Sequence, residues 1–424
     1  MCQLLKARTL NRAVKMMNDT NDPLAHYRDQ FHIPENMIYL DGNSLGAMVK
    51  TAPARLEKAI RQEWGNDLIT SWNKAGWWQL PLTLGAKIAP LIGAAPDSVV
   101  VTDSTSINIY KALHAALALK PDRSVIIAEK SSFPTDLYIA EGVASTRPNL
   151  QCRLIGEAGK ALGEALDDVL DDGVAVVLLN HVDYRSGTLL DMAEITGKIH
   201  AAGAIAIWDL CHSAGVFPVE LDAANVDFAI GCSYKYLNGG PGAPAFIYAN
   251  KRHHDQITQP LTGWWGHAEP FAFKQGFKAE IGVRAFLCGT QPILSMLALE
   301  AALEVFDGVD MSALREKSKA LTSLFADLVL DGAGQFDLTL FGPQKAGQRG
   351  SQVSFCHKNG YAIMQALIAR GVIGDFRQPD IIRFGFAPLY IGFDDVRNAA
   401  RILLDILANG DWKQYENEQD GTVT

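Results

Sequence analysis

The sequence lacks the short motifs that usually reveal a bound nucleotide or metal ion. No G-x-G-x-x-G stands between an expected strand and an expected helix, and no G-x-x-x-x-G-K-[ST] occurs, which argues against dinucleotide and P-loop enzymes. The six cysteines are scattered without a C-x-x-C pair, so we expect neither a zinc site nor a disulfide framework. This cysteine usage is typical of a reducing cytoplasm, and we expect no bound metal.

Excess positive charge and long apolar runs are also absent. The formal net charge is -9, whereas nucleic-acid binding favours a basic face, so nucleic acid is not an expected partner. The N-terminal stretch MCQLLKARTLNRAVKMM lacks the apolar core of a signal peptide. No run approaches the roughly eighteen apolar residues that mark a membrane span. We therefore expect a soluble cytoplasmic protein with no membrane partner.

The middle of the chain alternates apolar strands with helices. Four short segments are rich in β-branched residues and apolar on both faces: 124–130, 174–181, 204–209 and 226–231. Such strands belong to a parallel sheet that helices cover on both sides. A helix is expected over 191–203, between two of them. The sequence thus predicts an α/β domain with a mostly parallel central sheet, whose ligands lie at the carboxyl ends of the strands.

The pattern changes after about residue 300. A strong helix at 293–306 is followed by shorter strand-like segments and by the amphipathic stretch FDDVRNAARILLDILA, as in a smaller α+β domain. We expect residues 46–300 to form the large domain and residues 301–424 the small one. The N-terminal segment 1–45 is expected to be helical over its first forty residues and to pack with the small domain.

Lys235 is the leading catalytic candidate. It stands in GCSYKYLNGGPGAP, between an expected buried strand and a loop of glycine and proline. Such a place suits a lysine that must lose its proton and form a Schiff base with a carbonyl group. Asp209 closes the preceding expected strand, where its carboxylate could pair with the protonated ring nitrogen of pyridoxal phosphate (PLP). A surface lysine and a helix-capping aspartate are common separately, but their pairing on consecutive strands is much rarer by chance.

Other polar segments that follow expected strands could complete a cofactor site. TDSTSIN (102–108) opens a helix and could hold a phosphate, although an ordinary Ser/Thr cap has the same pattern. SSFPTD supplies Phe133, which could stack on a flat ring, and Asp136, which could stand near its polar edge. A proline turn around a buried phenylalanine explains this segment equally well. His212 follows Asp209 in WDLCHSAG, but a lone loop histidine is more often structural.

Two features point to an amino-acid substrate or to an interface. Arg383, in DIIRFGFAPLY, could hold a substrate carboxylate with its forked guanidinium group, or it could form an interdomain salt bridge. The tryptophan-rich segments SWNKAGWW and GWWGH could line an aromatic site or a subunit interface. Plain core packing is the alternative for each tryptophan.

Six segments, taken in order, resemble those of kynureninases, particularly the bacterial ones: YLDGNSLG, SSFPTD, WDLCHSAG, SYKYLNGGPG, GWWGH and IIRFGFAPLY. The resemblance spans nearly the whole chain. It implies the fold-type I, aspartate-aminotransferase-like architecture of PLP-dependent enzymes. It also implies a homodimer with active sites at the subunit interface. The implied reaction is hydrolysis of L-kynurenine to anthranilate and L-alanine, in tryptophan catabolism and NAD biosynthesis, with 3-hydroxykynurenine as a possible second substrate.

The same resemblance assigns roles to individual residues. Lys235 would carry the cofactor, Asp209 would pair with its ring nitrogen, and Tyr234 is the candidate for proton relay. The other implied cofactor contacts, of which the last two would be reached from the partner subunit, are Thr105, Ser106, Phe133, Asp136, His212, Trp264 and Thr290. The implied substrate contacts are Arg383, Trp72 and Ser44. An indole wall with small hydroxyl neighbours predicts a preference for L-kynurenine over its 3-hydroxy relative.

Two other interpretations stay open. A cysteine desulfurase of the same fold would need a nucleophilic cysteine on a mobile loop. Cys356 lies downstream of the lysine, but its segment QVSFCH alternates like a strand, which favours a structural cysteine. The other interpretation is a cofactor-binding regulatory or scaffold protein that kept the fold. Release of anthranilate, release of sulfide, or neither would separate the three.

Overall fold

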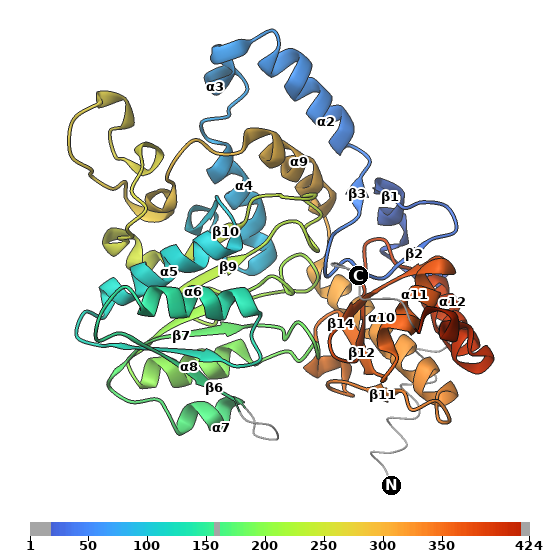
Figure 1. Cartoon of the computed structure of the whole chain (residues 1–424). Helices are drawn as coiled ribbons and strands as arrows, with labels where there is room; N and C mark the ends of the chain where they lie inside the picture. The colour runs from blue at the N-terminus through green and yellow to red at the C-terminus, as the bar shows by residue number, and fades with distance from the viewer. Residues whose placement is uncertain (1–17, 157–161, 417–424) are drawn as a thin grey trace. The chain divides into compact units, whose positions relative to one another are not determined.

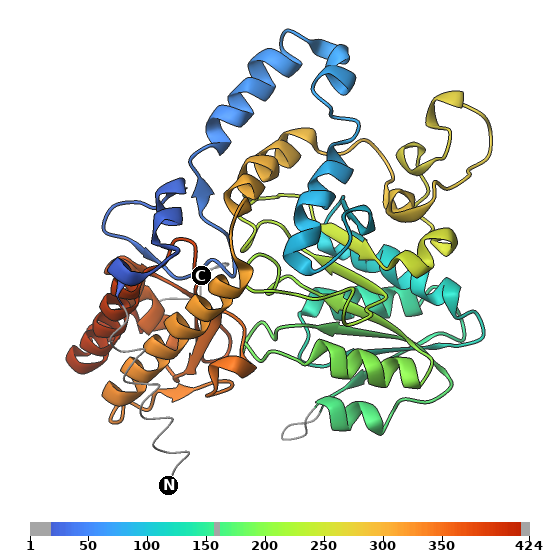
Figure 2. The same cartoon turned by 180° about the vertical axis from the view of Figure 1, so that it is seen from behind.

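The computed structural model describes residues 18–156 and 162–416, and its contacts divide them into two units. Unit 1 consists of residues 18–50, 184–189 and 305–416. Unit 2 consists of residues 51–156, 162–183 and 190–304. Figures 1 and 2 show the chain from opposite sides. The domain limits expected at residues 45 and 300 stay a prediction. The short segment 184–189 belongs to unit 1, although it falls inside the range 46–300 expected for the large domain.

Unit 2 is built on a seven-stranded sheet in the order β4-β10-β9-β8-β7-β5-β6. Its strands are β4 (Val99–Val101), β5 (Val125–Glu129), β6 (Gln151–Ile155), β7 (Val174–Asn180), β8 (Ile205–Asp209), β9 (Phe228–Gly231) and β10 (Phe246–Ala249). Neighbours from β6 to β9 run parallel, and β10 is antiparallel to both β9 and β4. The mostly parallel sheet expected from the four apolar segments is therefore confirmed.

Helices cover both faces of this sheet (Figure 1). Ile205 and Ile207 belong to the same buried cluster as side chains of α5 (Thr105–Leu119) and α6 (Pro134–Ala144). Trp208, which points to the opposite face, donates from its Nε1 to Thr196 of α8 (Met192–Ala201) at 3.0 Å. The other α-helices of unit 2 are α2 (Ala52–Lys58), α3 (Ser71–Lys74), α4 (Leu80–Ile88), α7 (Leu162–Asp167) and α9 (Ile293–Leu303).

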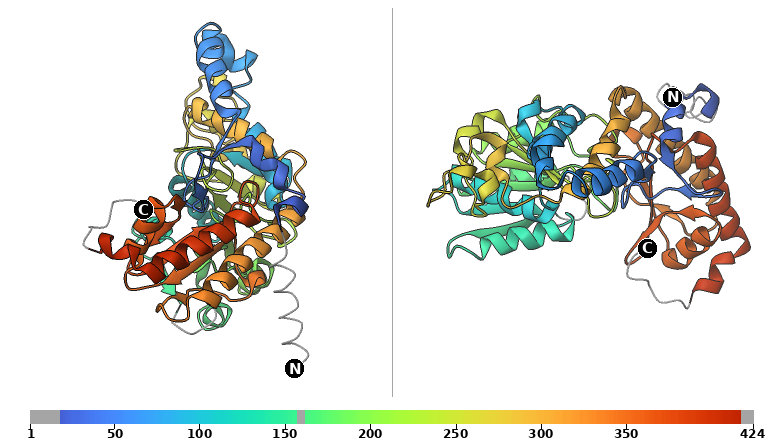
Figure 3. Two further views of the ribbon diagram at one scale, coloured as in Figure 1. Left: turned by 90° about the vertical axis from the view of Figure 1, so that its right-hand side faces the viewer. Right: turned by 90° about the horizontal axis from the view of Figure 1, so that it is seen from above.

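Unit 1 contains a four-stranded antiparallel sheet in the order β11-β12-β15-β14. These strands are β11 (Thr339–Leu340), β12 (Gln352–Cys356), β14 (Asp375–Arg377) and β15 (Ile381–Gly385). Its helices are α10 (Met311–Gly332), α11 (Gly360–Ala369) and α12 (Phe393–Asn409). Figure 3 shows α10 and α12 side by side. Phe325 of α10 packs against the rings of Phe355 and Phe384 in the sheet, which forms an aromatic core.

The N-terminal segment is not mainly helical, so that expectation is wrong for residues 18–40. This part contains two short 3-10 turns, Asp19–Asn21 and Ala25–Gln30, and the strands β1 (Phe31–His32) and β2 (Ile38–Tyr39). Strand β1 pairs with β3 (Met48–Val49), and β2 pairs with β13 (Val372–Ile373). Pairing with a distant strand satisfies backbone groups that a helix would otherwise satisfy internally. Residues 1–17 lie outside the described residues.

No helix in residues 18–156 or 162–416 is long and apolar enough to cross a membrane. The 22-residue α10 has the length, but charged side chains such as Arg315, Glu316 and Lys319 interrupt it. The same described residues contain no group of three His, Cys, Asp or Glu side chains placed to hold a metal ion.

Candidate active site

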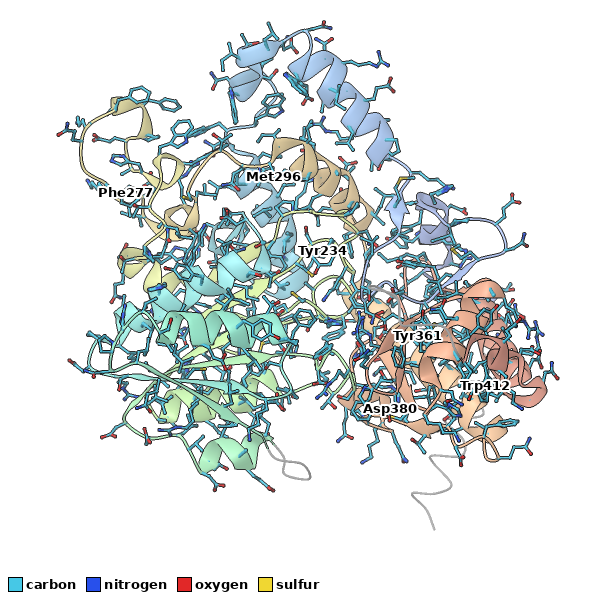
Figure 4. The ribbon with its side chains drawn as sticks, viewed as in Figure 1. Tyr234, Phe277, Met296, Tyr361, Asp380 and Trp412 are labelled. Atoms are coloured by element: carbon cyan, nitrogen blue, oxygen red, sulfur yellow. The ribbon has the colours of Figure 1, made fainter. Side chains whose placement is uncertain are left out.

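Lys235 lies in the loop that follows β9, next to Tyr234, which is labelled in Figure 4. Its Nζ is 3.0 Å from Nε2 of His212. The same atom lies 5.9 Å from the centre of the Phe133 ring and 5.8 Å from that of Tyr234. Four of the residues predicted from the sequence therefore surround one another at the carboxyl ends of the strands, where a doubly wound sheet binds its ligands.

The loop after Lys235 is fixed by its own sequence. Asn238 and Gly240 have φ angles of 58° and 88°, in the left-handed region that these two residue types tolerate best. The N–H group of Gly239 donates to the carbonyl oxygen of Ser233 at 2.9 Å, and the Ser233 hydroxyl donates to that of Pro244 at 2.5 Å. The chain thus turns back immediately after the lysine and holds its backbone in place.

Asp209 and Asp136 form a buried carboxyl pair. Asp209, the last residue of β8, is 4% exposed, and Asp136 in the first turn of α6 is 1% exposed. Oδ1 of Asp209 accepts from the N–H of Cys211 at 2.6 Å. Burial, and then the charge of the hydrogen-bonded Asp209, raises the pKa of Asp136 well above its usual range. Asp136 is therefore held in its neutral form, and the pair carries one negative charge rather than two, which suits a protonated ring nitrogen.

Asn180 is a site residue that the sequence analysis missed. It ends β7, and its Oδ1 accepts from the N–H of Phe133 at 2.9 Å while its Nδ2 donates to Asp136 at 2.6 Å. Its position as a polar residue after the apolar run VAVVLL is the signal that could have revealed it. The side chain of Phe133 is 43% exposed, so the alternative of a turn around a buried phenylalanine is wrong.

The N-terminus of α5 offers donors for a phosphate group. Thr105 and Ser106 lie in its first turn, both half-buried, and the hydroxyl of the capping residue Ser104 accepts from the N–H of Ile107 at 3.5 Å. The hydroxyl of Thr105 lies 3.8 Å from Sγ of Cys211, so this turn is adjacent to the loop after β8. Unpaired N–H groups and the positive end of the helix dipole favour an anion at such a place.

A fully buried lysine supports that turn. Lys111 in α5 has no solvent exposure, and its Nζ donates to Asp103 at 2.5 Å and to the carbonyl oxygen of Phe286 at 2.6 Å. Asp103 precedes α5 with a φ of 48°, and its carboxylate also accepts from the Thr102 hydroxyl at 2.6 Å. This network could not be predicted from the sequence, because a single lysine in a helix usually indicates a solvent-facing position.

The two tryptophan-rich segments meet in unit 2. Trp72 packs edge-on against Trp265 with ring centres 5.5 Å apart, and Trp78 stacks on Trp265 at 4.8 Å. Trp265 is fully buried, whereas Trp264 is 42% exposed. Core packing therefore explains Trp265, and Trp72, which is half-buried, is available as part of a wall. Thr290, in the loop before α9, is exposed.

Ser44 and Arg383 lie in unit 1, where they form an ion cluster with other residues. Arg383 is 2% exposed; its Nε donates to Oδ1 of Asp375 at 2.8 Å and its Nη2 donates to Oδ2 of the same carboxylate. Nη2 also donates to the Ser44 hydroxyl at 3.0 Å, and Nη1 donates to the carbonyl oxygen of Tyr184 at 2.5 Å. The forked pair expected with a substrate is thus formed with Asp375, and this salt bridge lies within one unit.

Two more charged side chains complete this arginine cluster, which consists of Asp41, Ser44, Asp375, Arg377 and Arg383. Nη2 of Arg377 lies 2.7 Å from Oδ2 of Asp375. Burial opposes the charge of Asp375, but the two arginines outweigh it and lower its pKa. Burial, and then the charge of Asp375, raises the pKa of Asp41 to about 7. The cluster therefore holds two guanidinium groups and two carboxyl groups, of which one titrates near neutral pH.

All the cofactor contacts predicted from the sequence lie in unit 2, whereas Ser44 and Arg383 lie in unit 1. The structure brings Lys235, His212, Phe133 and Tyr234 together, and it pairs Asp209 with Asp136. The role of each residue in binding or catalysis stays a prediction.

Solved structures show the fold. The cysteine desulfurase CsdA from Escherichia coli matches with a TM-score of 0.75 at 19% identity, covering 91% of this chain and 99% of that chain. A cysteine desulfurase from Thermococcus onnurineus has a TM-score of 0.76 at 17% identity, and the match covers 93% of this chain and 100% of that chain. A C-DES mutant with glycine covalently linked to its PLP cofactor has a TM-score of 0.76 at 19% identity, and the match covers 89% of this chain and 99% of that chain. The expected fold-type I architecture is therefore confirmed.

Sequence relatives show the family. Residues 314–403 match a family model described as "Kynureninase C-terminal domain". A curated kynureninase of Burkholderia mallei is 51% identical over 411 residues, which cover 96% of this chain and 98% of the relative. A kynureninase of Pseudomonas fluorescens is 49% identical over 411 residues, which cover 96% of this chain and 98% of that relative. At this identity over nearly its whole length, the chain belongs to the kynureninase family.

Proposed function

We propose that this protein is a PLP-dependent hydrolase that cleaves L-kynurenine to anthranilate and L-alanine in tryptophan catabolism. The observation that carries this function is 51% identity to a kynureninase over 96% of the chain. The site agrees with it, because Lys235 follows β9, Asp209 ends the neighbouring β8, and Asp136 pairs with Asp209 from the first turn of α6. The ring of Phe133 is exposed nearby.

The donor set fits PLP. When bound, PLP supplies an electron sink that weakens the bonds at the α-carbon of an amino acid. Lys235 would hold its carbonyl carbon, and the single negative charge of the Asp209–Asp136 pair would face its ring nitrogen. Phe133 would cover one face of the ring. The hydroxyl and N–H groups of Thr105 and of the residues beside it would bind the phosphate.

The same residues would move protons at the substrate. The amine of Lys235 would be the base that takes the proton from the substrate α-carbon, and His212, whose Nε2 lies 3.0 Å from Nζ of Lys235, would share that proton. The charge of Cys232, and then burial, raises the pKa of Tyr234 above its usual range. Tyr234 therefore stays a proton donor at working pH, as a relay to the bond-cleavage step requires.

We assign the substrate carboxylate to the arginine cluster. Asp375 is shared between Arg377 and Arg383, and the raised pKa of Asp41 keeps this acid partly neutral near pH 7. The cluster consequently retains positive charge in a buried setting, where an incoming carboxylate would be strongly favoured. Ser44, which touches both Arg383 and Asp375, would adjust when the substrate arrives.

We further propose that the enzyme is a cytoplasmic homodimer that serves NAD biosynthesis. Support for association comes from large apolar side chains exposed in two segments of unit 2. They are Ile60, Trp64, Leu68, Ile69, Phe271, Phe273, Phe277 and Ile281, of which Figure 4 labels Phe277. Clusters of exposed apolar groups are typical of protein–protein interfaces. Light scattering should give twice the mass of the chain, and a strictly monomeric enzyme would contradict the dimer.

Turnover decides the main proposal. Purified protein supplied with PLP should release anthranilate from L-kynurenine, and borohydride reduction followed by peptide mapping should place the pyridoxyl group on Lys235. Lys235→Ala should abolish both signals while the fold persists. Labelling of another lysine would overturn the role of Lys235, and the absence of anthranilate would overturn the function.

A cysteine desulfurase is the second candidate, because solved desulfurases share the fold. Cys356, however, is the last residue of β12 and pairs with Thr339 in the sheet. Its backbone is therefore not part of the mobile loop that such chemistry needs. Sulfide release from L-cysteine, faster than anthranilate release from L-kynurenine, would reverse this preference.

A further inference from the structure

Two cysteines meet within the predicted cofactor site. Cys211 and Cys232 follow the neighbouring parallel strands β8 and β9, in which Asp209 pairs with Ile230. Cys211 lies two residues after Asp209, and Cys232 lies two residues after Ile230. The N–H of Cys232 donates to Sγ of Cys211 at 3.2 Å, and Sγ of Cys232 donates to the carbonyl oxygen of Cys211 at 3.9 Å. The two residues are therefore in mutual contact.

This spacing permits a disulfide bond. Neighbouring strands lie about 4.8 Å apart, and a disulfide joins residues whose Cα atoms are about 4.4–6.8 Å apart. Because Sγ of Cys211 already touches the backbone of Cys232, rotation of the two side chains can bring the sulfurs together. Cys152 lies in β6 and Cys356 in unit 1, so neither is part of this pair.

The surroundings make one of the two thiols reactive. Burial raises the pKa of Cys232, but the hydrogen bond with Cys211 and the positive charge of Lys235 outweigh burial and lower it below its usual value. The same hydrogen bond, together with burial, raises the pKa of Cys211. Cys232 therefore ionises more readily than Cys211, and it is the nucleophile of the pair. It is 3% exposed and Cys211 is half-buried, so only a small oxidant fits.

We propose that Cys211 and Cys232 form a reversible disulfide when a small hydroperoxide reaches the cofactor-free protein, and that this disulfide prevents PLP binding. The thiolate of Cys232 attacks one peroxide oxygen, the O–O bond breaks, and the departing oxygen takes a proton as water or alcohol. Cys211 then attacks the resulting sulfenic acid, so that an S–S bond forms, the S–O bond breaks and water leaves with the Cys211 proton. Two thiols are oxidised and one peroxide is reduced.

The loss of PLP binding follows from the contacts that Cys211 makes with Asp209 and Thr105. This step rests on the proposed function. The N–H of Cys211 donates to Oδ1 of Asp209 at 2.6 Å, and its sulfur lies 3.8 Å from the hydroxyl of Thr105. Drawing Cys211 towards Cys232 displaces both contacts, which are those predicted for the ring nitrogen and the phosphate. Conversely, bound PLP would occupy the space beside Cys211 and shield the pair.

The test uses the full chain, reduced and then treated with hydrogen peroxide, with and without PLP. After peroxide treatment without PLP, N-ethylmaleimide added in denaturant should label four of the six cysteines, that is, six minus the linked two. Trypsin leaves both cysteines on one peptide, because no Lys or Arg lies between residues 199 and 234. Cleavage after Glu220 separates them, so the non-reduced digest should contain the linked fragments. Dithiothreitol should restore all six thiols, and PLP should prevent the linkage.

Binding of PLP, followed by quenching of tryptophan fluorescence, measures the consequence. Oxidised wild type should bind PLP at least about tenfold more weakly than reduced wild type, with recovery after dithiothreitol. Cys152→Ser, the matched control, should behave like wild type, whereas Cys211→Ser and Cys232→Ser should form no linkage. Six free thiols after peroxide, a different linkage, or undiminished PLP binding by the linked protein would each overturn the proposal. Failure of the reduced protein to bind PLP would instead count against the proposed function.

Discussion

Asp41 should make the stability of the protein fall as the pH rises towards neutrality. Burial, and then the charge of Asp375, raises the pKa of Asp41 from 3.8 to about 7. The folded state therefore binds this proton more tightly than the unfolded state. The resulting stabilisation is fully present below pH 3.8, the unfolded value, and is lost as the pH rises through about 7.

The size of the effect follows from the shift. A difference of about three pKa units corresponds to about 4 kcal/mol, at about 1.4 kcal/mol per unit. Asp41 is 6% exposed, so solvent screening is weak. Because the Asp375 carboxylate and the nearby arginines relax when Asp41 ionises, we expect about half of this value to be measured. Asp41→Asn removes the titration and keeps the shape of the side chain.

Thermal unfolding at several pH values tests this reasoning. At pH 8 the Asp41→Asn protein should melt a few degrees above wild type, and the gap should shrink steadily towards pH 4. Asp29→Asn, an exposed aspartate of the same segment, is the control and should show no gap that varies with pH. A variant that is less stable than wild type at pH 8, or a gap that does not change with pH, would refute the assignment.

Three further substitutions probe the site. Asp209→Ala should lower kcat for L-kynurenine at least about a hundredfold, roughly 2.7 kcal/mol of barrier; near-native turnover would show that another group serves the ring nitrogen. Arg383→Lys should raise KM and lower the melting temperature, because a point charge cannot reproduce the fork on Asp375; an unchanged KM would make the arginine purely structural. Lys111→Met should weaken PLP binding about tenfold by releasing Asp103, and an unchanged affinity in fluorescence titration would contradict that support.

The large sheet could be predicted because its strands carry their own signal. VAVVLL and AIAIW are apolar on both faces, which only a sheet covered by helices satisfies, and β7 and β8 are buried along their whole length. The rule that ligands bind at the carboxyl ends of such strands then selected Asp209 and the segment around Lys235. Local patterns and fold rules agree here, so the sequence alone was sufficient to predict the sheet and the place of these two residues.

Other features depend on partners that are distant in the sequence. Lys111 lies in a helix whose pattern gives no sign that its ammonium is fully buried, because Phe286 comes from another part of the chain. The N-terminal segment has helical composition, yet its β2 pairs with β13 more than three hundred residues later. Pairing between distant strands overrides a weak local preference in such cases. The pattern of residues within one segment does not reveal which distant strand it will pair with.

Arg383 shows how the two sequence-based interpretations of one residue can be combined. Its salt bridge with Asp375 resembles the structural alternative, but Asp375 also serves Arg377, so two cations share one carboxylate. When Asp41 is protonated, the cluster carries a net charge of about +1, and when Asp41 ionises the charge falls to about zero. A substrate carboxylate should then bind less well above pH 7. KM for L-kynurenine should rise there in wild type and stay flatter in Asp41→Asn, whereas parallel profiles would separate the cluster from the substrate.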